Sequence, residues 1–81
     1  MSYVYIATFA DEYSESRWEF KFAASSLESA IRRAVVVFGE YGIPESALKF
    51  EECCPGTLFK YTGIDEYLDE NYLLIERVEV L

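Results

Sequence analysis

The side chains that most often perform chemistry in proteins are scarce in this sequence. It contains no histidine, which is the commonest general base and the commonest ligand of transition metals. Its two cysteines, Cys53 and Cys54, directly follow Glu51 and Glu52. A nucleophilic cysteine needs a neighbouring group that favours its thiolate, and two glutamates do not supply one. We therefore expect a structural pair at the end of a strand, with one thiol pointing inward and the other outward.

Other motifs of catalytic or cofactor sites are missing as well. Adjacent cysteines are not a Cys-x-x-Cys metal or redox motif. The four glycines stand where turns are expected rather than in a phosphate-binding loop. A pair of carboxylates acting as acid and base would need a substrate cleft, which a chain of 81 residues rarely builds. The sequence therefore predicts a non-enzymatic protein without a metal or cofactor.

Acidic residues, in contrast, are abundant and clustered. Fifteen Asp and Glu residues outweigh seven Lys and Arg residues, which gives a formal net charge of -8. One cluster precedes the second predicted strand, a second is the Glu51 and Glu52 pair, and the third has the spacing i, i+1, i+4, i+5. Tyrosines beside the first and third clusters could anchor a partner, because tyrosine is frequent in binding hot spots. The predicted partner-binding residues are Asp11, Glu12, Tyr13, Glu15, Asp65, Glu66, Tyr67, Asp69 and Glu70.

This charge indicates which partners suit the protein. Direct binding to nucleic acid or to an anionic membrane requires cationic side chains, so neither is expected. A cationic protein surface is the natural complement. Carboxylates one helical turn apart are spaced by about 6 Å, compared with one phosphate per roughly 3.4 Å of a DNA strand. A ridge of such carboxylates could occupy a groove that normally holds nucleic acid; the alternative is that the acidity only solvates the surface.

Alternating and helical patterns define the elements that must position these clusters. A capping box formed by Ser25 and Glu28 predicts the start of a helix, and the stretch that includes Gly39 and Gly42 predicts its end. A turn signal at 54–57 joins two strands into a hairpin, and Gly63 is expected to break the second of them. The predicted strands are 3–9, 17–23, 48–52, 58–62 and 72–80, with a main helix at 26–39 and a short helix at 64–71.

These elements predict one α+β domain in the order ββαββ(α)β. An antiparallel sheet of about four to five strands would carry the main helix on one face. The other face would stay bare, and Tyr3, Tyr5 and Tyr61 are expected to cover part of it. The N-terminus lacks a basic region before an apolar stretch, and no apolar run approaches the roughly 20 residues of a membrane span. Adjacent cysteines cannot join distant parts of a chain, so a reducing cytoplasm is expected.

In size, charge and element order the chain resembles the phage-encoded anti-CRISPR proteins. The resemblance implies a small acidic inhibitor that acts in the cytoplasm of a host cell. Its partner would be a nucleic-acid-binding surface, such as that of a CRISPR-Cas effector complex. The resemblance transfers no functional residue. Bacterial immunity proteins that neutralise nuclease toxins have the same general character and fit about as well.

Self-association is the second functional hypothesis. The C-terminal strand ends in the apolar residues Val78, Val80 and Leu81, and exposed edge strands invite pairing. Val36 and Val37 widen the apolar face of the main helix beyond one stripe. Either feature could hold two copies of the chain together as a homodimer or a larger assembly.

Overall fold

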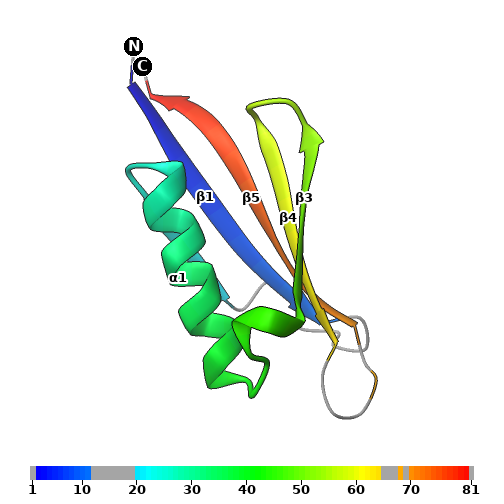
Figure 1. Ribbon diagram of the computed structural model, residues 1–81. Helices are drawn as coiled ribbons and strands as arrows, with labels where there is room; N and C mark the ends of the chain where they lie inside the picture. The colour runs from blue at the N-terminus through cyan, green and yellow to red at the C-terminus, as the bar shows by residue number, and fades with distance from the viewer. Residues whose placement is uncertain (1, 12–19, 65–67, 69, 81) are drawn as a thin grey trace.

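The fold is one helix packed on a five-stranded antiparallel sheet (Figure 1). The structure, a computed structural model, describes residues 2–11, 20–64, 68 and 70–80. This architecture confirms the predicted α+β class. The elements are β1 (Ser2–Asp11), β2 (Phe20–Ala24), α1 (Leu27–Glu40), the 3-10 helix η1 (Glu45–Ala47), β3 (Leu48–Cys54), β4 (Leu58–Ile64) and β5 (Glu70–Val80).

The strand order is β2-β1-β5-β4-β3, and every neighbouring pair is antiparallel. The C-terminal strand β5 therefore lies in the middle of the sheet, between β1 and β4. The expectation that β5 is an edge strand is wrong. Its pairing with β4 ends at Glu76, however, so the apolar residues Val78 and Val80 are paired with β1 alone and are 39% and 51% exposed. The terminal strands β2 and β3 are the edges instead.

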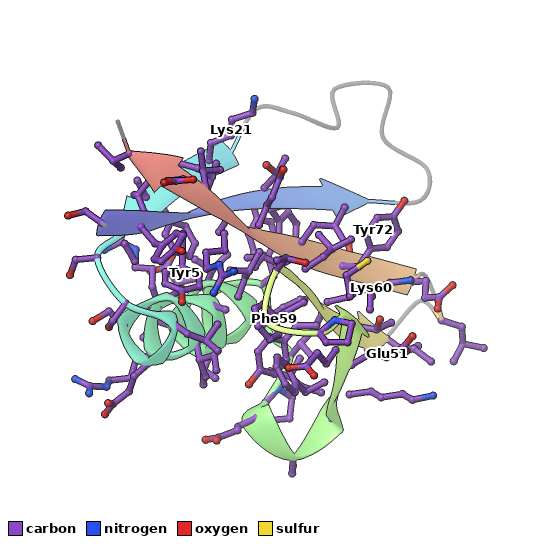
Figure 2. The ribbon with its side chains drawn as sticks, turned by 90° about the horizontal axis from the view of Figure 1, so that it is seen from above. Tyr5, Lys21, Glu51, Phe59, Lys60 and Tyr72 are labelled. Carbon is purple, nitrogen blue, oxygen red and sulfur yellow. The ribbon has the colours of Figure 1, made fainter. Side chains whose placement is uncertain are left out.

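Strand register assigns each side chain to one of the two faces of the sheet. Ala7 is paired with Ile75, which is paired with Phe59, and all three are buried beneath α1. Tyr3 and Tyr5 alternate with Ala7 along β1, and Tyr61 alternates with Phe59 along β4. All three tyrosines therefore lie on the helix side and not on the bare face as predicted. Figure 2 shows Tyr5 and Phe59 on the helix side of the sheet. The face without a helix, which we call the open face, carries apolar and lysine side chains instead: Val4, Ile6, Lys21, Leu58, Lys60, Tyr72 and Leu74.

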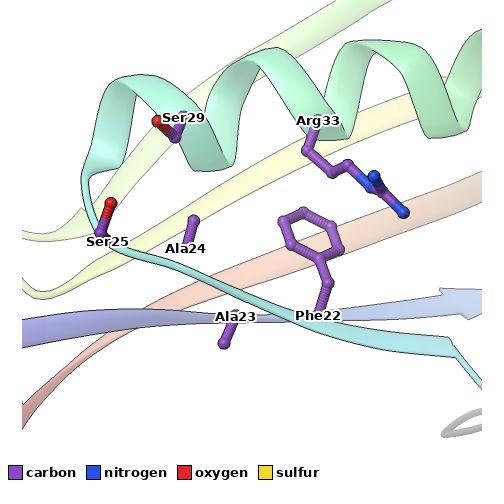
Figure 3. A pocket seen from close by; sticks show the side chains of 6 residues that line it. All are labelled: Phe22, Ala23, Ala24, Ser25, Ser29 and Arg33. Atoms are coloured by element: carbon purple, nitrogen blue, oxygen red, sulfur yellow. The ribbon is translucent and has the colours of Figure 1, made fainter.

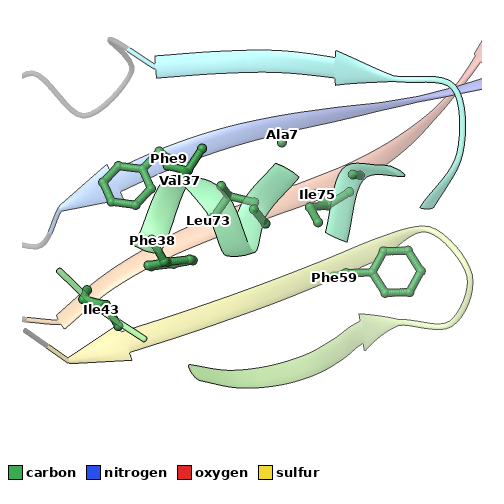
Figure 4. Packing of buried hydrophobic residues seen from close by; sticks show 10 residues of the cluster. Ala7, Phe9, Val37, Phe38, Ile43, Phe59, Leu73 and Ile75 are labelled. Carbon is green, nitrogen blue, oxygen red and sulfur yellow. The ribbon is translucent and has the colours of Figure 1, made fainter. Parts of the chain in front are cut away.

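The core lies between α1 and the three central strands (Figure 4). Aromatic rings occupy much of it: Phe38 meets Phe9 edge-on with ring centroids 5.5 Å apart, and the ring centroids of Phe38 and Tyr61 are 6.5 Å apart. Helix α1 contributes a stripe of apolar side chains with the predicted helical spacing. Val37 is also buried, at 2% exposure, whereas Val36 is 55% exposed. The buried hydrophobic residues are Ala7, Phe9, Ala30, Ala34, Val37, Phe38, Ile43, Phe59, Leu73 and Ile75.

The start of α1 differs by one residue from the predicted capping box. Ser26, not Ser25, is the N-cap, and its Oγ accepts a hydrogen bond of 3.1 Å from the backbone N–H of Ser29. Glu28 does not reach back to the cap; its carboxylate pairs with Arg32 one turn along the helix. Two consecutive serines offer the same cap chemistry, and the packing of the helix on the sheet decides which one has the extended backbone of a cap.

Ser26→Ala is therefore expected to destabilise the protein by about 1 kcal/mol, because one N–H at the helix start loses its acceptor. Ser25→Ala, the matched control one residue earlier, is expected to change stability by less than about 0.5 kcal/mol. Urea unfolding followed by circular dichroism measures both. Equal losses for the two variants would mean that Ser26 has no special role as the cap.

The end of α1 places a further residue in the core. Gly42 has φ +82°, and the N–H of the next residue, Ile43, donates to the carbonyl of Phe38 at 2.9 Å. The N–H of Gly42 donates to Gly39 at 3.0 Å. These two bonds form a Schellman motif, which usually brings the residue after the glycine against the last turn of the helix. Ile43 is accordingly 1% exposed, and the predicted end of the helix is confirmed.

The β3–β4 hairpin follows the predicted turn but not the predicted strand end. Thr57 N–H donates to Cys54 C=O at 3.0 Å, and Gly56 has the positive φ that the turn requires. Gly63, expected to break β4, is a buried residue inside it. Ile64 belongs to β4 rather than to a short helix.

Two other expectations are corrected near these strands. Glu70 and Asn71, the last residues of the predicted short helix, belong to β5, while positions 65–67 and 69 lie outside the described residues. Cys53 and Cys54 are both exposed free thiols, so neither points inward. The reason is that edge strand β3 lies outside the core, so each of its residues after Leu48 is exposed, whichever face of the sheet it is on. Strand alternation predicts a face of the sheet, not whether that face is covered.

Candidate functional site: an acidic end of the sheet

The first and third of the predicted acidic clusters connect to the same end of the sheet. Asp11, the last residue of β1, is paired with Asn71 near the start of β5. On its other side Asn71 is paired with Gly63, and Glu70 is paired with Ile64. Segment 12–19 follows β1 directly, and segment 65–69 joins β4 to β5. The two segments therefore leave the described strands at one end of the molecule, which we call the acidic end.

The structure describes only part of the predicted site. Asp11 ends β1, and Glu70 begins β5 with an exposed side chain. The paired strands bring the positions of these two residues to the same end. The remaining predicted residues lie outside the described ranges: Glu12, Tyr13, Glu15, Asp65, Glu66, Tyr67 and Asp69.

The C-terminus of α1 lies at the acidic end as well. Tyr41, its C-cap, stacks on Phe9 of β1 with ring centroids 4.8 Å apart. The last turn carries Glu40 and no basic residue. A helix C-terminus has a partial negative charge, which cations normally offset. Here the helix dipole and Glu40 add to the negative charge of the end instead.

Glu45, in η1, contributes to the same field. The pKa of the Tyr61 hydroxyl is raised, first because partial burial disfavours the phenolate and second because the negative charge of Glu45 opposes another. Glu45 lies in the linker that joins α1 to β3, and its charge therefore acts from this linker on Tyr61 of β4. Sequence reasoning missed Glu40 and Glu45 because each stands alone in the chain. The only signal was the absence of a basic residue near the expected helix end.

Most of the described cations lie on other surfaces. All three lysines, Lys21, Lys49 and Lys60, occupy strand positions of the open face. Lys60 sits 5.1 Å from the ring centroid of Tyr72, as Figure 2 illustrates. Arg77 lies 4.3 Å from the ring centroid of Tyr3, at the opposite end of the sheet. Two of these cations approach the acidic end: Lys49, whose partner Thr62 precedes Gly63, and Lys21, which directly follows the first residue of β2.

The remaining acidic pair is separate from the acidic end. Glu51 and Glu52 are exposed on edge strand β3, where Glu51 is paired with Lys60 and Glu52 with Phe59. Successive positions of a strand face opposite sides of the sheet, so the two carboxylates do not act together. They do not form the second cluster that their adjacency in the sequence suggested.

Neither a relative of this chain nor a metal site or membrane span among its described residues was found. Comparisons with family models, curated proteins and solved structures found nothing similar to this chain. Among the described residues, no group of three or more His, Cys, Asp or Glu side chains could hold a metal ion. Over those same ranges, no helix is both long and apolar enough to cross a lipid bilayer.

Proposed function

We propose that the protein is a non-enzymatic inhibitor whose acidic end binds a basic, nucleic-acid-binding surface of another protein. A CRISPR-Cas effector complex is the partner class that we propose to test first. One observation carries the proposal: the described residues that flank segments 12–19 and 65–69, although remote in sequence, lie at the end of the sheet where α1 ends. This places the helix C-terminus, Glu40, Glu45 and Glu70 with the anchors of both acidic clusters.

A concentrated negative end is a better ligand for a basic groove than scattered charge. Summed fields from one region steer a partner into a defined orientation, and scattered charges mainly aid solubility. Because the Debye length is only about 10 Å at 0.1 M salt, the attraction must come from carboxylates close to the interface. The binding is therefore expected to weaken steeply with salt and to compete with DNA or RNA for the same surface.

The test has two stages. The tagged protein is incubated with extracts of bacteria that contain nucleic-acid-handling complexes, washed at low and then high salt, and the eluted proteins are identified. The purified partner is then titrated with a labelled DNA duplex in the presence of this protein. Displacement of the duplex supports the proposal. A partner that binds the protein and the duplex together contradicts it, and a nuclease toxin bound at a site away from DNA would point to an immunity protein.

A charge-reversal variant of the acidic end gives a sharper prediction. Glu40→Lys, Glu45→Lys and Glu70→Lys together are expected to weaken binding to that partner by about tenfold or more at low salt, because attraction becomes repulsion. All three side chains are exposed, so the fold should tolerate the changes. Isothermal calorimetry at two salt concentrations measures the loss.

The matched control reverses the same amount of charge elsewhere. Glu51→Lys, Glu76→Lys and Glu79→Lys change exposed strand residues that lie away from the acidic end. Their combined effect on affinity is expected to stay below about threefold, since the partner does not approach these strands closely. If both triple variants lose affinity equally, net charge alone drives binding and the acidic end is not the site.

A further inference from the structure

A separate hollow lies along the edge strand β2, away from the acidic end. It has a volume of about 500 Å³ and is bounded on one side by β2 and the residues that follow it, and on the other by α1 (Figure 3). Its walls combine an aromatic ring, small side chains, two hydroxyls and one guanidinium. The lining residues are Phe22, Ala23, Ala24, Ser25, Ser29 and Arg33.

The strand that forms one wall can accept another strand. In the described sheet β2 pairs with β1 and ends the strand order. An edge strand directs alternate backbone N–H and C=O groups away from the sheet, where an added strand can bond to them. Small residues at Ala23 and Ala24 let another backbone approach. The five residues of β2 suit a short extended segment rather than a long one.

The helix wall supplies a guanidinium that pairs with no carboxylate of the described residues. Arg33 lies with its guanidinium 5.8 Å from the ring centroid of Phe22, where it borders the hollow. The ion pair found among the described residues joins Arg32 to Glu28, and within those ranges Arg33 has no acidic partner. The guanidinium presents several N–H donors in a plane that matches a carboxylate. The hollow is thus a locally cationic site on an acidic protein.

We infer that this hollow binds an extended peptide that adds to β2 as a sixth strand and places one carboxylate side chain on Arg33. Main-chain hydrogen bonds to β2 supply sequence-independent affinity, and alternate side chains of the peptide enter the hollow. Because Phe22 and Ala24 share the helix side of β2, the peptide side chains on that side are small and apolar apart from the one acid. A strongly acidic peptide is disfavoured, since the whole protein carries a charge of -8.

The probe is a fluorescent peptide with the sequence Thr-Val-Thr-Asp-Thr-Val, capped at both ends, in which Val and Asp alternate with threonines that face solvent. Fluorescence anisotropy measures its affinity, and amide chemical shifts of the labelled protein locate the site. Binding should shift the amides of residues 20–25 and 29–33. Replacing the peptide Asp by Asn, or Arg33→Gln in the protein, should each weaken binding by about tenfold, as expected for a charge-assisted hydrogen bond.

Two controls keep the test decisive. Arg32→Gln removes the neighbouring exposed cation that pairs with Glu28 and should leave affinity unchanged. A peptide with N-methylated threonine and aspartate amides keeps its side chains but cannot bond to a strand edge, so it should not bind. The inference is overturned if no saturable binding occurs up to millimolar peptide, if the shifts lie elsewhere, or if the N-methylated peptide binds as well. Equal effects of the two arginine variants would also overturn it, and dimerisation through β2 would show a second copy as the occupant.

Discussion

Phe38→Ala is expected to destabilise the protein by about 3–5 kcal/mol and to lower both its urea midpoint and its melting temperature. The ring is fully buried and packs against Phe9 and Tyr61. Its removal forfeits the burial of an aromatic side chain and leaves a cavity that the sheet cannot close. Small domains have a total stability of only about 5–15 kcal/mol, so one such loss is a large share. Thermal and urea unfolding followed by near-ultraviolet circular dichroism will measure it.

The control is two residues away on the same helix. Val36→Ala removes a side chain that is 55% exposed, and we expect a change of less than about 0.5 kcal/mol. This pair of variants also tests where the helix meets the sheet. If the Val36 substitution destabilised the protein as much as that of Phe38, the apolar face at Val36 would be covered in solution, and the self-association hypothesis would regain support.

Gly63→Ala is expected to destabilise the fold by about 1–3 kcal/mol, although alanine is the smallest possible replacement. An added Cβ would lie 2.9 Å from Cγ2 of Ile43 and 2.9 Å from Cδ2 of Leu48. Leu48 can rotate away because it is only partly buried, but Ile43 is β-branched and 1% exposed, so it cannot. Either β4 or the linker from α1 must shift. Urea unfolding with an unchanged m-value will show the loss as a lower midpoint.

A second glycine provides a control, because its replacement by alanine is expected to raise stability rather than lower it. Gly39 lies inside α1 with no atom within 4 Å of an added Cβ. Gly39→Ala should therefore stabilise the protein by about 0.5–1 kcal/mol through helix propensity. In an Ile43→Ala background, Gly63→Ala should cost much less, because the clashing atom is gone. A full cost in that background would show that the clash with Ile43 is not the cause.

The Gly63 contact also bears on the proposed function. Gly63 is paired with Asn71, which is paired with Asp11, so it sits among the strands that hold the acidic end. Close packing of Ile43 on Gly63 brings the linker after α1 onto β4. This contact keeps the helix C-terminus beside the origin of both acidic segments. We therefore expect substitutions at Gly63 to weaken partner binding as well as stability.

The sequence by itself determined the kind of each main element. Alternation of apolar residues predicted the strands, and helical spacing with glycines at its end predicted α1, because both patterns reflect the local geometry of one element. The turn at Pro55 and Gly56 follows from backbone preferences alone. Local sequence patterns were less informative where two neighbouring residues could fill the same role, as Ser25 and Ser26 could as the helix cap. They failed at Cys53 and Cys54, because alternation does not report that edge strand β3 is exposed on both faces.

Only the tertiary structure decided how these elements combine. Pairing of β1 with β5 joins the two ends of the chain, and no local pattern reports which distant strand is the partner. That pairing makes β5 central and brings Asp11 and Glu70 to one end of the sheet. Likewise Gly63 reads as a strand breaker in isolation, whereas in the fold it is the one residue small enough to admit Ile43. The physical reason is that the periodicity of apolar residues indicates only which face of a helix or strand is buried. Which other element covers that face depends on the complementary shapes of the packed side chains and on the pairing of strand backbones.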